Sequence, residues 1–563
     1  MASTPVTLHD LYPDRAFYRP GEEVRLIVEL AAERPCRVRV TASITHLAKE
    51  LAAPSRTLAL QRGRHSVTLN WRPPPTAPRG YGVDVRVEAE GGEPLDRRST
   101  AFDVLERWSQ RPRYGFLTDF TPGREDVDQT VAALARYHIN GLQFYDWMYR
   151  HAELLPPEGQ EEFTDPLGRR LSMGTVRAFI AAAHARNMAA MPYTAIYGAS
   201  PEFAEARPGW VLYRPSGEPI TFAGGFLTLM NPASGSPWAE HLLGQFEAVL
   251  RATDFDGLHI DQYGEEHTGS VARDAAGRPV DLPEAFVGMI RAARARATAI
   301  SPRRNAIVFN CVANWPIEAI APAEVDFVYI ELWPPDVTYG ALHRVIVQAW
   351  QLSGGKPVVL AAYTDPQKAV TVRLMKAVIF ASGGTQIELG ERDGMLADPY
   401  FPQYRPIPPA LRRTLRRYYD FAVRYGDVLA GDAQDATPQR AARILIEGQP
   451  VSADLSPDTV AAISRRGAGF EALSLINLRG IHTPQWTDPA PPPPLRLTDL
   501  RVRVYVEGPV RRLRWASPDV EPRLRPLPFA QGADRKGAYL EFTLPELAYW
   551  ALIILEATAE DHL

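Results

Sequence analysis

The chain has 563 residues, of which 45% are hydrophobic, and its formal net charge is -4. A chain of this length and composition buries more than one hydrophobic core, so we expect a soluble protein of roughly two to four domains. The slight acidic surplus excludes the basic surface needed to bind a nucleic-acid backbone or an anionic membrane, and it favours an uncharged ligand.

Two cysteines, Cys36 and Cys311, lie far apart in the sequence and in different predicted domains. Their number and separation exclude a disulfide framework and a metal-binding CxxC motif. The N-terminal segment has neither the basic start nor the apolar run of a secretory signal, and no stretch of about 18 apolar residues could span a bilayer. We therefore expect a cytoplasmic protein, or a secreted protein whose leader has been removed.

Residues 1–107 alternate apolar and polar side chains with the period of two that is typical of β-strands. The turn signal Arg19-Pro20-Gly21 and the stretch "RPPPTAPRG" separate the strand-like segments "EEVRLIVEL", "CRVRVTASI", "HSVTLNW" and "YGVDVRVEAE". Short strands at this spacing predict an immunoglobulin-like β-sandwich.

From residue 108 the pattern changes to short apolar strands that alternate with amphipathic stretches such as "TVRAFIAAAHARN". The strand candidates are "YGFLTDF", "GLQFYDW", "MAAMPYTAIYG", "FDGLHIDQYG", "AIVFNCVANW", "VDFVYIELW", "PVVLAAYT" and "VIFASGGTQIELG". Eight strands with crossover helices predict a (β/α)8 TIM barrel over residues 108–430. An open doubly wound sheet is the alternative, although no GxGxxG motif follows the first strand to support a dinucleotide site.

The last region, residues 431–563, again has the periodicity of strands. Its strand candidates are "AARILIEG", "GFEALSLINLRG", "LRVRVYVEG", "GAYLEFTL" and "YWALIILE", interrupted by a stiff proline-rich tract at 489–494. We predict an antiparallel β-sandwich here. The whole chain is therefore expected to be a multidomain protein with a central α/β barrel between two all-β domains.

Six of the eight predicted barrel strands end in polar or aromatic residues that the packed interior of a barrel would not accommodate. They are Asp119, Tyr145-Asp146-Trp147, Tyr193, Asp261, Asn310 and Glu331-Leu332-Trp333. The carboxyl ends of the strands form the active-site face of such a barrel, so this clustering indicates a functional site. A single aspartate could equally cap a helix or close a turn, and only the whole set favours function.

Asp261 and Glu331 are the two carboxylates best placed to act together. Their strands are separated around the predicted barrel by one other strand, so the side chains could face each other across its mouth. Cleavage of a glycosidic bond uses one carboxylate at the anomeric carbon and one carboxylic acid that protonates the leaving oxygen. A carboxyl separation of about 5 to 5.5 Å implies retention of configuration, and about 6.5 to 9.5 Å implies inversion.

Other side chains near the same strand ends support a sugar substrate. The residues that could offer flat apolar faces to a pyranose are Tyr145, Trp147, Tyr149, Tyr263, Trp315 and Trp333. The residues that could form hydrogen bonds with sugar hydroxyls are Asp119, Asp146, His259, Asn310 and Glu388. The alternative for about half of the aromatic residues is ordinary packing.

The segment Glu265-Glu266-His267 raises the alternative of a metal-dependent hydrolase in which Asp261 is a further ligand. Adjacent side chains rarely converge on one ion, so a solvated acidic loop is the simpler interpretation. We predict no metal site and no cofactor. A decayed barrel that only binds carbohydrate is a further alternative, but decay would be expected to remove one of the two carboxylates.

Long motifs occur in order between about residues 110 and 405: "YGFLTDF", "NGLQFYDWMYRH", "YTAIYGAS", "FDGLHIDQYG", "VYIELWP" and "IELGERDGMLADPYFP". In order and spacing they resemble glycoside hydrolase family 66, the dextranases and cycloisomaltooligosaccharide glucanotransferases, and "FYRPGEEV" resembles the opening of that family's N-terminal β-domain. The resemblance implies a retaining enzyme that acts on α-1,6-glucans such as dextran or isomaltooligosaccharides. It implies Asp261 as nucleophile and Glu331 as general acid/base.

The resemblance also helps to decide whether the enzyme hydrolyses or cyclises its substrate. The cyclising members carry a carbohydrate-binding module after the seventh strand, whereas here "PVVLAAYT" and "VIFASGG" are separated by room for one helix only. We therefore expect the endo-acting, hydrolytic dextranase branch. A cycloisomaltooligosaccharide glucanotransferase or another α-glucan transglycosylase is the alternative, and transglycosylation could persist as a side reaction.

Overall fold

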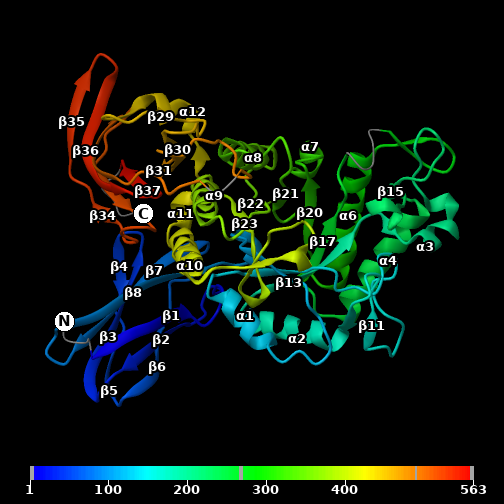
Figure 1. The fold of residues 1–563 in the computed structure, drawn as a ribbon, viewed down its shortest axis with the longest axis horizontal. Helices are drawn as coiled ribbons and strands as arrows, with labels where there is room; N and C mark the ends of the chain where they lie inside the picture. The colour runs from blue at the N-terminus through cyan, green and yellow to red at the C-terminus, as the bar shows by residue number, and fades with distance from the viewer. Residues whose placement is uncertain (1–4, 266–270, 489–490, 558–563) are drawn as a thin grey trace.

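The computed structural model describes residues 5–265, 271–488 and 491–557 and shows a multidomain chain rich in β-strands (Figure 1). The N-terminal strands, in blue, and the C-terminal strands, in orange and red, lie at one side of the molecule (Figure 1). The central sheet and its helices extend to the other side. Within the described residues, no helix is long and apolar enough to cross a membrane.

The N-terminal region forms two antiparallel sheets. The first contains β1 (Val6–Pro13), β2 (Val24–Ala32) and β6 (Gly63–Trp71). The second contains β3 (Cys36–His46), β4 (Lys49–Ala52), β5 (Ser55–Leu60), β7 (Arg79–Ala89) and β8 (Pro94–Val104). Every second residue of β2 is buried, and one hydrophobic cluster contains side chains from both sheets, as the period of two in the sequence predicts.

The central sheet contains, within the described residues, eight parallel strands paired in chain order. They are β9 (Tyr114–Leu117), β10 (Gly141–Phe144), β13 (Ala189–Ala195), β17 (Gly257–Asp261), β20 (Ala306–Val312), β21 (Val328–Glu331), β22 (Val358–Ala361) and β23 (Thr385–Ile387). The short strand β24 (Leu389–Gly390) follows β23 and pairs in parallel with β9, so the curved sheet returns to its first strand. Beyond it, β25 (Gly394–Met395) and β26 (Arg405–Pro406) add antiparallel pairs.

Helices follow most of these strands. The longer ones are α1 (Val127–Ala135), α2 (Met173–His184), α4 (Pro237–Ala252), α6 (Leu282–Ile300), α8 (Tyr339–Leu352), α9 (Ala369–Ala381) and α10 (Pro409–Arg424). Their amino ends are defined locally, because the side chains of Ser172, Ser236, Asp281 and Thr338 accept hydrogen bonds from backbone N–H groups of the first turns of α2, α4, α6 and α8. Short elements in the connections include β11 (Glu162–Thr164), β12 (Arg170–Ser172), β14 (Gly198–Ala199), α3 (Pro201–Glu205), β15 (Thr221–Phe222), β16 (Leu227–Leu229), β18 (Ala272–Arg273), β19 (Pro279–Val280) and α7 (Ile317–Ile320).

The eighth predicted strand segment, "VIFASGGTQIELG", was only partly right. Its first four residues end helix α9, and the chain then turns through Gly383, which has a φ of 83°, before β23 begins at Thr385. A short apolar run does not separate a buried helix from a buried strand, which explains the error. The single helix α9 between β22 and β23 agrees with the spacing read from the sequence.

The C-terminal region also forms two sheets. One contains β27 (Gln434–Asp435), β29 (Val451–Ser452), β30 (Val460–Gly467), β31 (Phe470–Asn477), β33 (Arg512–Ala516), β34 (Arg525–Pro526) and β37 (Trp550–Glu556). The other contains β28 (Ile444–Ile446), β32 (Leu497–Tyr505), β35 (Phe529–Asp534) and β36 (Gly537–Leu547). The strand pairs are antiparallel except for β29 with β30, and a hydrophobic cluster contains side chains from both sheets.

Helix α10 connects the central region to both terminal regions. Nη2 of Arg424 donates to Oδ2 of Asp84 in β7 at 2.7 Å, and both side chains are buried. The hydroxyl of Tyr418 donates to Oδ1 of Asp519 in the C-terminal region at 3.0 Å. Because breaking a buried ion pair is strongly destabilising, these contacts hold the three regions together around α10.

Candidate active site

A cavity of about 630 Å³ lies at the carboxyl ends of the central strands. Nine of the residues that the sequence singled out line it: Tyr145, Tyr193, His259, Asp261, Tyr263, Asn310, Trp315, Glu331 and Trp333. Parallel strands in one sheet end at the same edge, and this brings residues from distant parts of the chain together.

Asp261 and Glu331 are joined by one side chain. Nδ2 of Asn310, on the strand between them, donates to Oδ1 of Asp261 at 2.7 Å and to Oε2 of Glu331 at 2.8 Å. These two carboxylate oxygens therefore lie at most about 5.5 Å apart, the sum of the two distances, which is less than the 6.5 to 9.5 Å typical of inverting glycosidases.

Asp261 accepts two further hydrogen bonds. The hydroxyl of Tyr193 donates to Oδ2 at 2.8 Å, and the backbone N–H of Gln262 donates to Oδ1 at 2.9 Å. Burial and, to a smaller extent, the charge of Glu331 raise the pKa of Asp261 to about 7, although the hydrogen bonds from Tyr193, Asn310 and Gln262 act in the opposite direction. The nearby negative charge of Glu331 therefore makes ionisation of Asp261 less favourable.

Glu331 is held by donors from two more positions. Nε1 of Trp333 donates to Oε1 at 2.9 Å, and the hydroxyl of Tyr363 donates to the same oxygen at 2.7 Å. Since Asn310 occupies Oε2, both carboxylate oxygens are fixed before any substrate binds. Fixed side chains at this position are what a reaction that transfers a proton to a bound group needs.

Aromatic rings form the walls of the cavity. Tyr263 stacks on Phe222 with ring centroids 4.1 Å apart, and Tyr145 stacks on Phe401 at 4.4 Å. Trp333 is 37% exposed at the rim, an unusual state for so large an apolar side chain. Flat rings beside hydrogen-bonding groups suit a ligand with both C–H faces and hydroxyls.

His259 lies deeper, two residues before Asp261 on the same face of β17. Its Nδ1 is 3.2 Å from the hydroxyl of Tyr114, and its ring packs edge to face against Tyr329. Burial lowers the pKa of His259 to about 3, so the imidazole is neutral in the neutral pH range and forms an uncharged floor under the two carboxylates.

Asp119 and Asp146, which the sequence assigned to substrate binding, lie outside this cavity. Oδ2 of Asp119 accepts a hydrogen bond from Arg392 at 2.8 Å. Asp146 faces Arg169, with a nitrogen–oxygen distance of 3.4 Å, and burial raises its pKa to about 7. The strand β10 ends at Phe144 and the backbone of Asp146 has a φ of 51°, so the chain turns directly after Tyr145; Tyr145 lines the cavity and Asp146 does not.

Trp147 and Glu388 also lie outside. Trp147 is fully buried, and its indole N–H donates to the backbone carbonyl of Tyr193 at 3.1 Å, so it supports the cavity wall from behind. Glu388, between β23 and β24, points between helices α9 and α10, where it pairs with Lys376 at 2.5 Å and accepts a hydrogen bond from Tyr419 at 3.0 Å. Tyr149, also named above, packs edge to face on Phe163.

Several lining residues were not assigned a role from the sequence. Tyr193, two residues before the end of β13, was named among the strand-end residues but given no role, and Tyr363, two residues after β22, was not named; the strand-end position that identified Asp261 and Glu331 could have identified Tyr363 too. Phe222 and Phe401 come from connections distant in the sequence, in β15 and in the turn Phe401–Gln403, and no periodicity marks them.

The proposed metal ligands Glu266 and His267 lie outside the described residues. Among the described residues, no cluster of three or more His, Cys, Asp or Glu side chains is arranged to hold a metal ion. Within that same part of the chain, Cys36 and Cys311 are both free thiols.

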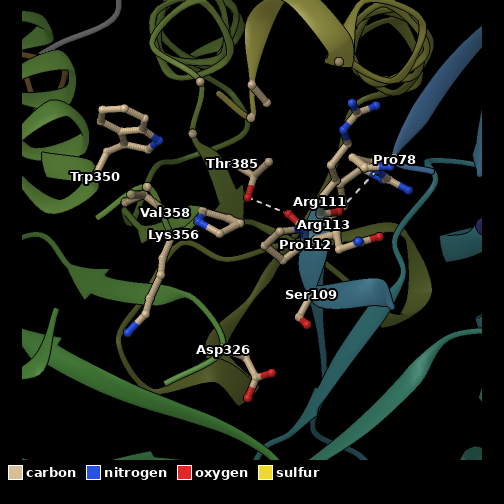
Figure 2. A pocket seen from close by; sticks show the side chains of 18 of the residues that line it. Pro78, Ser109, Arg111, Pro112, Arg113, Asp326, Trp350, Lys356, Val358 and Thr385 are labelled. Carbon is tan, nitrogen blue, oxygen red and sulfur yellow. Dashed lines mark hydrogen bonds between the residues drawn. The ribbon is translucent and has the colours of Figure 1, made fainter. Parts of the chain in front are cut away.

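A second cavity, of about 750 Å³, lies at the amino ends of β9, β21, β22 and β23 (Figure 2). Two of its charged groups take part in ion pairs: Arg113 with Asp103 at 2.7 Å, and Asp326 with Arg294. Nζ of Lys356 donates to a backbone carbonyl at 3.0 Å. This cavity is the larger of the two, but the paired carboxylates lie in the first, which we therefore take as the candidate active site.

Comparison with known proteins agrees with this choice of chemistry. The profile described as glycosyl hydrolase family 66 matches residues 13–554, nearly the whole chain. The chain belongs to glycosyl hydrolase family 66. It is therefore an enzyme of the glycoside hydrolase type.

Two curated relatives and one solved structure illustrate the similarity. A cycloisomaltooligosaccharide glucanotransferase of Niallia circulans is 26% identical over 715 residues, covering 99% of this chain and 73% of that protein. A dextranase of Streptococcus salivarius is 23% identical over 475 residues, covering 72% of this chain and 57% of that protein. A crystal structure of a Paenibacillus sp. cycloisomaltooligosaccharide glucanotransferase complexed with cycloisomaltoheptaose has a TM-score of 0.90 at 24% identity, covering 97% of this chain and 99% of that one. The last comparison shows a shared fold.

Proposed function

We propose that this family 66 enzyme is an endo-acting, retaining glycoside hydrolase that cleaves α-1,6-glucosidic linkages in dextran or isomaltooligosaccharides. The observation that carries the proposal is the single amide of Asn310 hydrogen-bonded to both Asp261 and Glu331. It holds one oxygen of each carboxylate at most about 5.5 Å apart in a cavity walled by aromatic rings, which is too close for the inverting arrangement and favours double displacement.

In this mechanism Asp261 is the nucleophile and Glu331 the general acid/base. An oxygen of Asp261 forms a bond to the anomeric carbon while the glycosidic C–O bond breaks, and Glu331 gives its proton to the leaving oxygen. Glu331, now ionised, then takes a proton from water, whose oxygen attacks the anomeric carbon and releases Asp261. Two inversions restore the original configuration.

The electrostatics of the site favour a single proton shared by the two carboxyl groups. The reaction begins with one proton shared between the two carboxyl groups, and it requires that proton on Glu331. Burial and the mutual repulsion of the two charges, which raise the pKa of Asp261 to about 7, favour a pair that keeps one proton near neutral pH. The hydrogen bonds from Tyr193 and Gln262 favour the ionised form of Asp261, the form that attacks.

We further propose that the central strands close into a (β/α)8 TIM barrel over residues 108–430. The pairing of β24 with β9 supports closure, and the chain order of the parallel strands supports the topology. The paired sheets on either side support an immunoglobulin-like β-sandwich over 1–107 and an antiparallel β-sandwich over 431–563.

Cyclisation is the second candidate, because a cycloisomaltooligosaccharide glucanotransferase matches this chain over 99% of its length. Both reactions share the glycosyl-enzyme intermediate and differ only in whether water or the other end of the same glucan accepts the glycosyl group. The single helix between β22 and β23 leaves no room there for an inserted module, which favours hydrolysis.

Incubation with dextran tests both candidates. We expect linear isomaltooligosaccharides whose newly formed reducing ends are first released as the α-anomer, as observed by NMR during the first minutes. Cyclic products would show that the enzyme catalyses cyclisation and not hydrolysis. Initial release of the β-anomer, or no cleavage of dextran at all, would contradict the retaining α-1,6-glucanase.

A further inference from the structure

Asn310 uses all of its donor capacity on the two carboxylates. A side-chain amide nitrogen carries two hydrogens, and here one points to Oδ1 of Asp261 and the other to Oε2 of Glu331. The side chain is buried, and its Oδ1 has no hydrogen-bond partner among the described residues. No donor of this amide is left for a sugar hydroxyl, which was the role expected from the sequence.

The orientation of this amide is fixed by the pair. Turning the group over would bring Oδ1 against two carboxylate oxygens, and at least one of them is ionised whenever the site is ready to react. The backbone beneath it cannot adjust, because β20 lies between β17 and β21 and pairs with both. The side chain is thus a rigid bridge between the carboxyl groups.

We propose that Asn310 is a positioning residue that sets the separation of Asp261 and Glu331 and links their protonation. The proposal rests on the proposed function in assigning those two residues to the reaction. Its physical content is that one neutral donor stabilises negative charge at both positions, so the same group controls both ionisation steps.

The effect on each step follows from counting hydrogen bonds. In the first ionisation step one carboxylate becomes charged, and without the amide it lacks one N–H donor. In the second step both carboxylates are charged, and without the amide each lacks its N–H donor. The apparent pKa of both steps must therefore rise. Tyr193 donates only to Asp261, and Tyr363 donates only to Glu331, so loss of either hydroxyl affects mainly one step.

Other titratable groups face the pair from every surrounding element, but most keep one protonation state over the relevant pH range. Burial raises the pKa of the phenols above their usual range and lowers that of the imidazole to about 3; these groups are Tyr145, Tyr193, Tyr197, Tyr263, Tyr329, Tyr363 and His259. Asp146, behind Tyr145, titrates near pH 7, and Glu265 lies exposed at the rim. Both remain in all the variants compared below, so differences between the variants report on Asn310.

The test is the pH profile of kcat/KM with an aryl α-isomaltoside for the wild type, Asn310→Ala, Tyr193→Phe and Tyr363→Phe. We expect Asn310→Ala to move both limbs to higher pH by about one to two units, since a hydrogen bond to a charged group is worth roughly that much in pKa. We expect kcat at its own optimum to fall on the order of 100-fold as the pair loses its fixed geometry. The two phenylalanine variants should each move mainly one limb.

If Asn310→Ala lowers kcat but leaves both limbs of the pH profile at their wild-type pH, the proposal is overturned, because a merely structural role lowers the rate without changing the titration. Movement of one limb alone would overturn it too. If Asn310→Ala does not fold, Asn310→Ser fills more of the space and has a hydroxyl too short to reach both carboxylates.

A second measurement separates this proposal from the proposed function, because it needs no substrate. The difference in Tm between the wild type and Asn310→Ala is measured from pH 4 to pH 9. The hydrogen bond from Asn310 lowers the pKa of Asp261 in the folded state, and the second N–H stabilises the ionised form of Glu331, so the stabilising effect is present at high pH and is lost as the carboxylates become protonated at lower pH. The Tm difference should therefore widen with rising pH. A difference independent of pH would contradict the linked-protonation role even for an enzyme that leaves dextran intact.

Discussion

Asp261→Asn is expected to lower kcat on dextran by roughly 10⁴- to 10⁶-fold, the range associated with removing a nucleophile. An amide has almost the shape of the carboxylate but does not attack an anomeric carbon. The measurement is the initial rate of reducing-end formation with purified protein of verified secondary structure. Asp119→Asn is the matched control, because Asp119 lies outside the cavity and pairs with Arg392, and it should keep most of the activity.

The same substitution should make the protein more stable at neutral pH. The pKa of Asp261 is raised from 3.8 to about 7 by burial and by Glu331, so its ionisation costs folding free energy as pH rises through this range. A neutral amide avoids that cost. We expect the Tm of Asp261→Asn to equal that of the wild type below about pH 4 and to exceed it increasingly up to about pH 7. In the rate measurement, a kcat of Asp261→Asn on dextran above a tenth of the wild-type kcat would rule out Asp261 as the nucleophile.

Glu331→Gln is expected to lower kcat on dextran by about 10²- to 10⁴-fold, the usual contribution of general acid–base catalysis. The loss should be much smaller with an aryl glycoside whose leaving group needs no proton, because only the hydrolysis of the intermediate then requires Glu331. Comparing the two substrates separates loss of proton transfer from loss of folding.

Azide gives a sharper form of this test. In Glu331→Ala, a small anion can enter the space of the missing carboxylate and attack the intermediate without general-base help. We expect azide to restore turnover of the aryl glycoside and to give an α-glycosyl azide as the product. In Asp261→Ala, azide should not give the α-glycosyl azide, because this variant forms no glycosyl-enzyme intermediate for azide to attack. Failure of azide to accelerate Glu331→Ala would assign the acid/base to another residue.

The sequence indicated the two carboxylates that we propose as the catalytic pair, because their positions in the predicted fold could be inferred from the strand pattern. Asp261 and Glu331 each end an apolar strand, and parallel strands present their carboxyl ends at one edge. Asn310 was found by the same rule, but its contacts were not predictable, because a strand-end position does not specify which donor meets which acceptor. In the structure its amide nitrogen donates hydrogen bonds to both carboxylates and does not face the solvent.

The sequence was less informative where orientation or long connections decide the outcome. Asp146 and Trp147 follow Tyr145 directly, yet only Tyr145 lines the cavity, because the strand has ended at Phe144 and the chain turns at Asp146, where φ is 51°. Glu388 lies at the interruption between β23 and β24, where its direction depended on the buried Lys376. Phe222 and Phe401 come from connections whose paths are set by tertiary packing, and local patterns do not predict such paths.

Trapping the covalent intermediate tests the central claim most directly. The wild type is treated with a fluorinated α-glucosyl fluoride that forms the intermediate quickly and releases it slowly, and the protein is then digested and sequenced by mass spectrometry. We predict one glycosyl adduct per molecule, carried on Asp261. An adduct on a different carboxylate, or complete turnover of the reagent with inverted configuration and no adduct, would contradict the account.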